Sequence, residues 1–308
     1  MKYKIYKLSF STAVHFGSGR LGSTDDIFLA DRLFSAMCIE AVRTYGPEGA
    51  KRLADMARQG RLALSDGFPY MGKTLYLPKP MIHIETGDAG NSAVKKAFKK
   101  LRFIPEGKLQ DYLRGELDAQ AEARVLENLG RKTEKISAAV SGRDDTLPYR
   151  IGTYEFSENC GLYFILGYDS DEVYELIKKL IRSIGYEGIG GKVSSGLGKF
   201  TSAAEDIPDD LATALGGGYK RYMALSVCMA RDSEMERAVC GACYSLVKRS
   251  GFISSTDYAD RQVKKRTVYF FSSGSCFDCT FEGEVFDLGG RGSHPVYRYA
   301  KPMLMGVM

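Results

Sequence analysis

A glycine-rich segment directly follows the most regular apolar pattern in the chain. Six glycines fall within the fifteen residues from Gly185 to Lys199. Glycine adopts backbone conformations that other residues avoid and lets another backbone approach closely, but each glycine costs conformational entropy on folding. Lys192 and Lys199 add positive charge beside the loop's N–H groups, which suits a phosphate chain. We therefore favour a phosphate-binding loop over a simple helix-to-strand connector.

Neither common nucleotide-binding fingerprint occurs in this loop. A G-x-x-x-x-G-K-[ST] match ending at Lys192 would need glycine where Tyr186 stands and serine or threonine where Val193 stands. The G-x-G-x-x-G pattern of dinucleotide-binding proteins does not occur in the loop either. The loop is therefore not assigned to a nucleotide-cofactor enzyme, and we expect no cofactor.

The segments around the loop alternate between strand and helix patterns. Residues 3–14 alternate as a strand, and residues 27–45 carry apolar side chains at helical spacing after the cap-like run Thr24-Asp25-Asp26. Residues 161–168 predict a buried strand. A second helix starts after Ser170 and ends at Gly185, and a strand begins at Phe200. The helix is indicated by Val173, Leu176, Ile177, Leu180, Ile181 and Ile184. The order is a βαββαβ pattern.

The remaining segments predict a second, similar half. The pattern of residues 206–218 predicts a linker, and that of residues 220–231 predicts a strand. Asp232 and Ser233 are expected to cap a helix that reaches Leu246. Further strands are expected between residues 267 and 304. The two prolines within residues 75–80 limit that stretch to an edge strand. The sequence therefore predicts an α+β protein of two halves.

Composition limits the broad class of the protein. The chain has 308 residues with 43 Lys+Arg and 38 Asp+Glu, and this size corresponds to roughly two domains. The balance of 44% hydrophobic and 26% charged residues excludes a disordered, collagenous or disulfide-scaffold protein. Seven cysteines, an odd number, suit a reducing compartment. No apolar run is long enough for a membrane span or a signal peptide, so we expect a soluble, cytoplasmic protein with no membrane partner.

The middle of the chain carries much of the positive charge. Residues 92–135 hold 11 basic and 7 acidic residues, a local surplus close to the net charge of +5 for the whole chain. Such a run is either a solvated helix face or an arm that lies along a phosphate backbone. Both interpretations remain open from the residues alone.

Two cysteine pairs form a CxxC…CxxC pattern, which often binds zinc. Cys240 and Cys243 fall within a helical pattern, whereas Cys276 and Cys279 fall in a strand pattern, where residues three apart point to opposite faces. We therefore expect no bound metal. A zinc-dependent nucleic-acid-binding module remains the alternative.

An ordered set of motifs along the chain resembles the RAMP superfamily of CRISPR proteins. The motifs are His15-Phe16-Gly17, Ala30-Asp31-Arg32-Leu33-Phe34-Ser35-Ala36, Leu64-Ser65-Asp66-Gly67-Phe68-Pro69-Tyr70 with Leu77-Pro78-Lys79-Pro80, Gly161-Leu162-Tyr163-Phe164, the glycine loop, and His294-Pro295-Val296-Tyr297-Arg298-Tyr299-Ala300-Lys301-Pro302. The chain is most similar to the subunit that holds the crRNA 5′ handle in type III-A (Csm) effector complexes.

This resemblance implies two ferredoxin-like (RRM-like) units with a glycine-rich loop and an inserted basic thumb. The units would span residues 1–205, with the insertion at about 83–146, and residues 219–308. The implied function is a non-catalytic RNA-binding subunit that joins the large polymerase/cyclase-domain subunit to the backbone RAMP subunits and meets target RNA only indirectly. The RNP1 run of RNA-reading sheets is absent, so loops and backbone contacts would hold the RNA. The residues expected to contact crRNA are His15, Gly17, Ser18, Lys79, Lys95, Lys96, Lys99, Lys100, Gly188, Gly190, Gly191, Lys192, Ser194, Ser195, Gly196, Gly198 and Lys199.

An endoribonuclease of the same superfamily is the alternative. His15 is a candidate general base, and the other two histidines, His83 and His294, lie far from it in sequence. Asp25 and Asp26 are candidate metal-binding carboxylates. We favour a helix-capping role for these aspartates, and a packed or phosphate-contacting role for His15.

Overall fold

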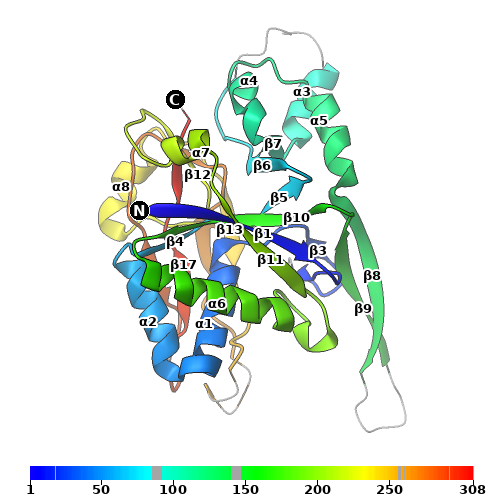
Figure 1. Cartoon of the computed structure of the whole chain (residues 1–308), viewed down its shortest axis with the longest axis vertical. Coiled ribbons are helices and arrows are strands. Elements are labelled where there is room, and N and C mark those ends of the chain that lie inside the picture. The colour runs from blue at the N-terminus through cyan, green and yellow to red at the C-terminus, as the bar shows by residue number, and fades with distance from the viewer. Residues whose placement is uncertain are drawn as a thin grey trace.

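Helices and antiparallel strands alternate through the whole molecule (Figure 1). The computed structural model describes every residue except residue 18, residues 85–91 and 140–146, and residues 256, 257, 260, 262, 291 and 308. Within that described part, none of the helices has both the length and the apolar character needed to cross a membrane. The mixed α+β class predicted from the sequence is confirmed.

A seven-stranded sheet forms the centre of the molecule. Its order is β11-β1-β10-β5-β6-β7, and β4 pairs with a second stretch of β10. The strands are β1 (Lys2–Phe10), β4 (Leu62–Leu64), β5 (Phe68–Met71), β6 (Thr74–Pro78), β7 (Phe103–Pro105), β10 (Cys160–Tyr168) and β11 (Phe200–Asp206). The apolar run predicted as a buried strand is β10, which lies next to β1 at the centre of the sheet.

The two faces of this sheet bury different side chains because residues alternate along each strand. Leu8 of β1 and Phe164 of β10 face the cluster that contains the helices α1 (Ala30–Tyr45), α2 (Pro47–Arg58) and α6 (Asp171–Glu187). Ile5 and Ile165, which are partners in the register, face a second cluster with strands from the C-terminal part. The central strands are therefore covered on both sides.

The helix α6 begins where the sequence predicts but ends later. Ser170 accepts a hydrogen bond from the Val173 N–H at 3.5 Å. Gly185 lies inside the helix, and a Cβ atom there would lie 2.6 Å from the Phe200 carbonyl oxygen. The end comes at Glu187, followed by Gly188 with φ 106°. Gly185 is thus required by close packing against β11, not by helix termination.

The start of α1 is capped from a distance. Thr24–Asp25 forms the short strand β3, which pairs with β2 (Phe16–Gly17), and the N-cap residue Leu29 makes no side-chain cap. The Oδ1 atom of Asp66 instead accepts the Ala30 N–H at 2.7 Å. The expected capping role of Thr24, Asp25 and Asp26 is therefore wrong.

The inserted segment divides into a helical lobe and a long hairpin. The lobe contains α3 (Ser92–Lys100), β7, α4 (Leu109–Leu113) and α5 (Ala119–Leu126) around a small core of its own. The hairpin pairs β8 (Gly130–Ala139) with β9 (Leu147–Phe156), so it extends past residue 146. Because β7 pairs with β6, the proline-containing strand β6 lies inside the sheet. The expectation of an edge strand there is wrong, since the insertion supplies the next strand.

In the residues that the structure describes, the C-terminal part is built from short strands and the helices α7 (Asp209–Ala214) and α8 (Asp232–Val239). The strands are β12 (Tyr222–Ala224), β13 (Leu246–Arg249), β14 (Val268–Phe271), β15 (Cys276–Phe277), β16 (Glu284–Asp287), β17 (Tyr297–Ala300) and β18 (Leu304–Gly306). The expected linker contains α7, whose Leu211 is buried against the sheet. The strand predicted for residues 220–231 covers only β12, and α8 ends before Leu246, which lies on β13.

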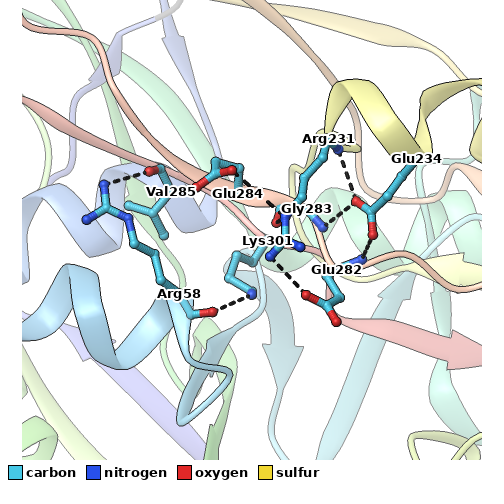
Figure 2. Close-up of polar contacts among 8 residues, drawn as sticks. All are labelled: Arg58, Arg231, Glu234, Glu282, Gly283, Glu284, Val285 and Lys301. Atoms are coloured by element: carbon cyan, nitrogen blue, oxygen red, sulfur yellow. Dashed lines mark hydrogen bonds and ion pairs between the residues drawn. The ribbon is translucent and has the colours of Figure 1, made fainter.

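Polar joints tie the C-terminal part to the N-terminal helices. Figure 2 shows Lys301 donating to the carbonyl oxygen of Arg58 at the end of α2, at 3.3 Å, while the Arg58 guanidinium donates to the Val285 carbonyl oxygen at 3.0 Å. A second joint lies at the first turn of α1, where the buried carboxylate of Asp31 binds both Arg249 and Arg298. These contacts hold the two parts of the chain together.

Candidate nucleic-acid interface

The glycine loop leaves the end of α6 and returns to the sheet at β11. Gly188, Gly190, Gly196 and Gly198 all have positive φ, and Lys192 also adopts the left-handed conformation with φ 61°. Other L residues rarely adopt such angles, so this loop path depends on glycine. A 3-10 turn at Val193–Ser195 lies at its tip.

Most of the loop glycines pack against the protein itself. A Cβ atom at Gly198 would lie 2.1 Å from the Ile189 carbonyl oxygen, and one at Gly188 would lie 2.4 Å from the Leu197 carbonyl oxygen. A Cβ at Gly190 would lie 2.7 Å from the carbonyl oxygen of His15. At Gly196 a Cβ would meet no atom within 4 Å. Close approach by a ligand backbone is therefore possible at Gly196, while the other three shape the loop.

His15 fixes the loop to the neighbouring hairpin. Its Nδ1 atom lies 2.7 Å from the Gly152 carbonyl oxygen on β9, and its own carbonyl oxygen accepts the Gly191 N–H at 2.8 Å. The ring packs on two glycines, because a Cβ at Gly17 would lie 3.1 Å from Nε2 and one at Gly191 would lie 2.7 Å from Cδ2. The side chain is buried at 6% exposure. The structure thus gives His15 a packing role and brings it together with Gly17 and the loop.

Cationic side chains surround the loop. The Lys192 Nζ atom lies 5.1 Å from the ring centroid of Tyr149 on β9, and the Lys135 Nζ atom on β8 donates to the Ser195 carbonyl oxygen at 3.4 Å. Lys199 is exposed at the end of the loop. None of these three lysines makes an ion pair with a carboxylate in the described residues. The β8–β9 hairpin and the loop therefore share one positively charged surface.

Arg32 is a cation of this region that the sequence did not single out. It follows Asp31 on α1, donates to the Gly17 carbonyl oxygen at 3.1 Å, and lies over the ring of Phe16. Burial lowers the pKa of Arg32 to about 10, so the guanidinium stays charged at neutral pH. The Ala30–Ala36 motif contained this residue, but only the fold shows that it reaches Gly17.

The basic residues of the insertion lie elsewhere. Lys96, Lys99 and Lys100 are exposed on α3, in the lobe at the opposite end of the molecule from the loop between α6 and β11 (Figure 1). Lys79 donates to the Phe98 carbonyl oxygen at 2.7 Å, and burial lowers its pKa. The structure does not bring these lysines to the glycine loop. Ser18 lies outside the described residues, as does the side chain of Lys95.

The candidate nuclease residues are not assembled into one site. The three histidines make no contact with one another in the described residues, and His294 Nε2 instead lies 2.8 Å from Ser255 Oγ. Asp26 is held by two bonds of 2.9 Å from Arg102. Asp25 is exposed on β3.

The four cysteines of the CxxC pairs are only partly brought together. Cys243 and Cys276 form an antiparallel bridge through their backbones, with N···O distances of 2.9 and 2.8 Å. Cys240 follows the end of α8 and is exposed, so the expected helical position of this pair is wrong. No group of three or more His, Cys, Asp or Glu side chains suited to a metal ion occurs in the described part of the chain.

Family comparisons agree with this arrangement of sheet, loop and C-terminal strands. Residues 7–201 match the RAMP superfamily, and residues 218–307 match the CRISPR Csm4 C-terminal domain. The chain therefore belongs to the RAMP superfamily, as the sequence motifs predict.

Curated relatives define the family more narrowly. The chain is 33% identical over 308 residues to the "CRISPR system Cms protein Csm4" of Mycobacterium tuberculosis, covering 100% of this chain and 98% of the relative. It is 34% identical over 312 residues to the protein of the same name from Streptococcus thermophilus, covering 98% of each. The chain is thus a member of the Csm4 family.

Solved structures share the fold over the full length. A chain in the crystal structure of a Csm3-Csm4 subcomplex of a type III-A interference complex matches with a TM-score of 0.67 and 20% identity, covering 99% of both chains. A chain in a Csm1-Csm4 cassette with AMPPNP matches with a TM-score of 0.61 and 18% identity, covering 100% of this chain and 98% of that one.

Proposed function

We propose that this chain is a non-catalytic RNA-binding subunit of a cytoplasmic type III-A CRISPR complex, and that its glycine loop holds the crRNA 5′ handle. The observation that carries this proposal is the surface around the loop, where Lys192, Lys199 and Arg32 have no carboxylate ion-pair partner in the described residues. An unpaired cluster of cations suits a polyanion. Membership in the Csm4 family is the reason for proposing that this polyanion is crRNA.

The same proposal includes its assembly partners. In the similar structures, Csm4 is assembled with Csm3 in one case and with Csm1 in the other. We propose that this chain likewise bridges a large Csm1-type subunit and a Csm3-type backbone subunit, and meets target RNA only indirectly through the complex.

The strand order and the family membership together support a more detailed description of the fold. The strand order β11-β1-β10-β4/β5, with α1 and α6 in the two crossover connections, supports a ferredoxin-like unit. We propose one such unit at residues 1–205, carrying the insertion at about 83–146, and a second at residues 219–308. The insertion would act as a thumb against neighbouring subunits.

Salt dependence of RNA binding tests the loop directly. The variant Lys192→Ala/Lys199→Ala removes two charges without changing a glycine. If both lysines contact phosphates of single-stranded RNA, the slope of log affinity against log salt concentration flattens by up to about 1.4. The exposed pair Lys178→Ala/Lys179→Ala on α6 is the matched control. An unchanged slope contradicts the proposal, and RNA cleavage that disappears with the loop lysines would favour a nuclease.

A further inference from the structure

A two-stranded ribbon in the C-terminal part exposes aromatic side chains. The strands β13 and β14 pair with Lys248 opposite Tyr269, and beyond them Phe252 forms a bridge with Lys264. The inner face of the ribbon, with Phe270, packs on the core beside α1. On the outside, Tyr269 is 51% exposed and Phe252 is 55% exposed. Exposed apolar side chains that gather on one surface of a protein mark a binding site.

Positive charge is interleaved with these rings. Residues 244–255 and 263–277 contain no aspartate or glutamate. Lys248, Lys264 and Arg266 are exposed, and none of them forms an ion pair with any residue that the structure describes. On the strands of the β8–β9 hairpin, by contrast, both arginines are paired, Arg131 with Glu155 at 2.9 Å and Arg150 with Glu134 at 3.2 Å. Within the part of the ribbon that the structure describes, these three cations therefore have no carboxylate partner.

The ribbon is anchored next to the glycine-loop surface. Arg249, the last residue of β13, donates to Asp31 at 2.9 and 2.8 Å. Arg32 is the next residue on α1 and donates to the Gly17 carbonyl oxygen beside His15. The ribbon and the loop therefore lie on either side of the first turn of α1.

We propose that the β13–β14 ribbon is a second binding surface for single-stranded RNA, continuous with the glycine loop. Bases would stack on Tyr269 and Phe252, while Lys248, Lys264 and Arg266 contact phosphates, which is how many proteins bind single strands without sequence preference. The aromatic rings and Arg266 would suit a protein interface as well, but the two lysines favour RNA, because lysine is depleted at protein interfaces. This inference rests on the proposal that the chain binds crRNA.

The test uses the full chain and a fluorescein-labelled 20-nucleotide oligouridine RNA, with affinity measured by fluorescence anisotropy over a series of salt concentrations. Tyr269→Ala and Phe252→Ala should each weaken binding about 5- to 100-fold, because one stacked base is lost. Tyr269→Phe keeps the ring and should retain affinity. Tyr45→Ala, an exposed tyrosine at the other end of α1, should have no effect.

The lysines give an independent measurement. Lys248→Ala/Lys264→Ala should flatten the salt slope by up to about 1.4, even if an aromatic variant folds poorly. If the ribbon variants keep their RNA affinity and salt slope while Lys192→Ala/Lys199→Ala binds weakly, the ribbon is not an RNA-binding surface. The proposed function of the glycine loop would then be unaffected. Unchanged binding in all variants, or no binding by the unaltered chain, would contradict both. Ribbon variants that keep RNA affinity but fail to co-purify with a large or backbone subunit would show a protein interface instead.

Discussion

The buried carboxylate of Asp31 is expected to be the main electrostatic link between the two parts of the chain. It is fully buried and binds the guanidinium groups of both Arg249 and Arg298. Burial alone raises the pKa of this carboxyl group, but the two arginines outweigh that effect and lower it from 3.8 to about 2. A pKa difference of this size corresponds to roughly 2 kcal/mol in favour of the charged form.

Asp31→Asn removes this charge and leaves two buried arginines without it. Breaking a buried pair in this way costs about 3–5 kcal/mol, which corresponds to a lower melting midpoint by roughly 5–8 °C for a chain of this size. Melting is followed by circular dichroism at pH 7. The control is Asp55→Asn, which removes an exposed pair with Arg58 at 3.3 Å and should cost under about 1 kcal/mol.

The pH dependence of folding stability provides a second check on the role of Asp31. The unfolded chain takes up a proton at this carboxyl group near pH 4, whereas the folded chain does so only near pH 2. The stabilisation by Asp31 is therefore present above about pH 4 and is lost as the pH falls to about 2. The Asp31→Asn variant should lack this contribution to the change of unfolding free energy with pH. Equal losses of stability for Asp31→Asn and Asp55→Asn would show that Asp31 is not the main electrostatic link between the two parts of the chain.

Three further changes should have distinct outcomes. Gly198→Ala should destabilise the fold more than Gly196→Ala in urea denaturation, because only the first Cβ meets a carbonyl oxygen, at 2.1 Å; equal effects would contradict the packing role. Burial raises the pKa of Asp66 to about 7, so stability should fall as the pH rises from about 4 to 7, and Asp66→Asn should flatten that fall. The purified chain should hold no stoichiometric zinc, and Cys240→Ser with Cys243→Ser should melt like the unaltered chain; one zinc per chain by metal analysis would count against this.

Local patterns in the sequence predict the central elements well. The apolar run of β10 and the regular spacing along α6 depend on burial against immediate neighbours, and both elements lie where the sequence indicates. The glycine loop is also correctly placed between α6 and β11. Most of its glycines, however, are required because other parts of the protein pack closely against them. The sequence does not show this requirement, since it arises only when the fold places His15 against Gly191.

Long-range contacts account for what the sequence did not predict. Asp66 caps α1 from 36 residues away, so nothing near Ala30 shows it. The strand β6 becomes an inner strand because β7 of the insertion pairs with it. The role of Arg32 and the exposed face of the β13–β14 ribbon likewise depend on which segments pack together. For the ribbon, the short run Lys264-Lys265-Arg266 is a local signal of its positive charge.

The most direct test of the central claim is nuclease footprinting of crRNA in the reconstituted complex. We expect the 5′ handle to be protected in the complex with the unaltered chain and to become accessible with Lys192→Ala/Lys199→Ala. Protection of the remaining crRNA by other subunits should persist. Full handle protection with the double variant, in a complex of normal composition, would contradict the claim that the glycine loop holds the handle.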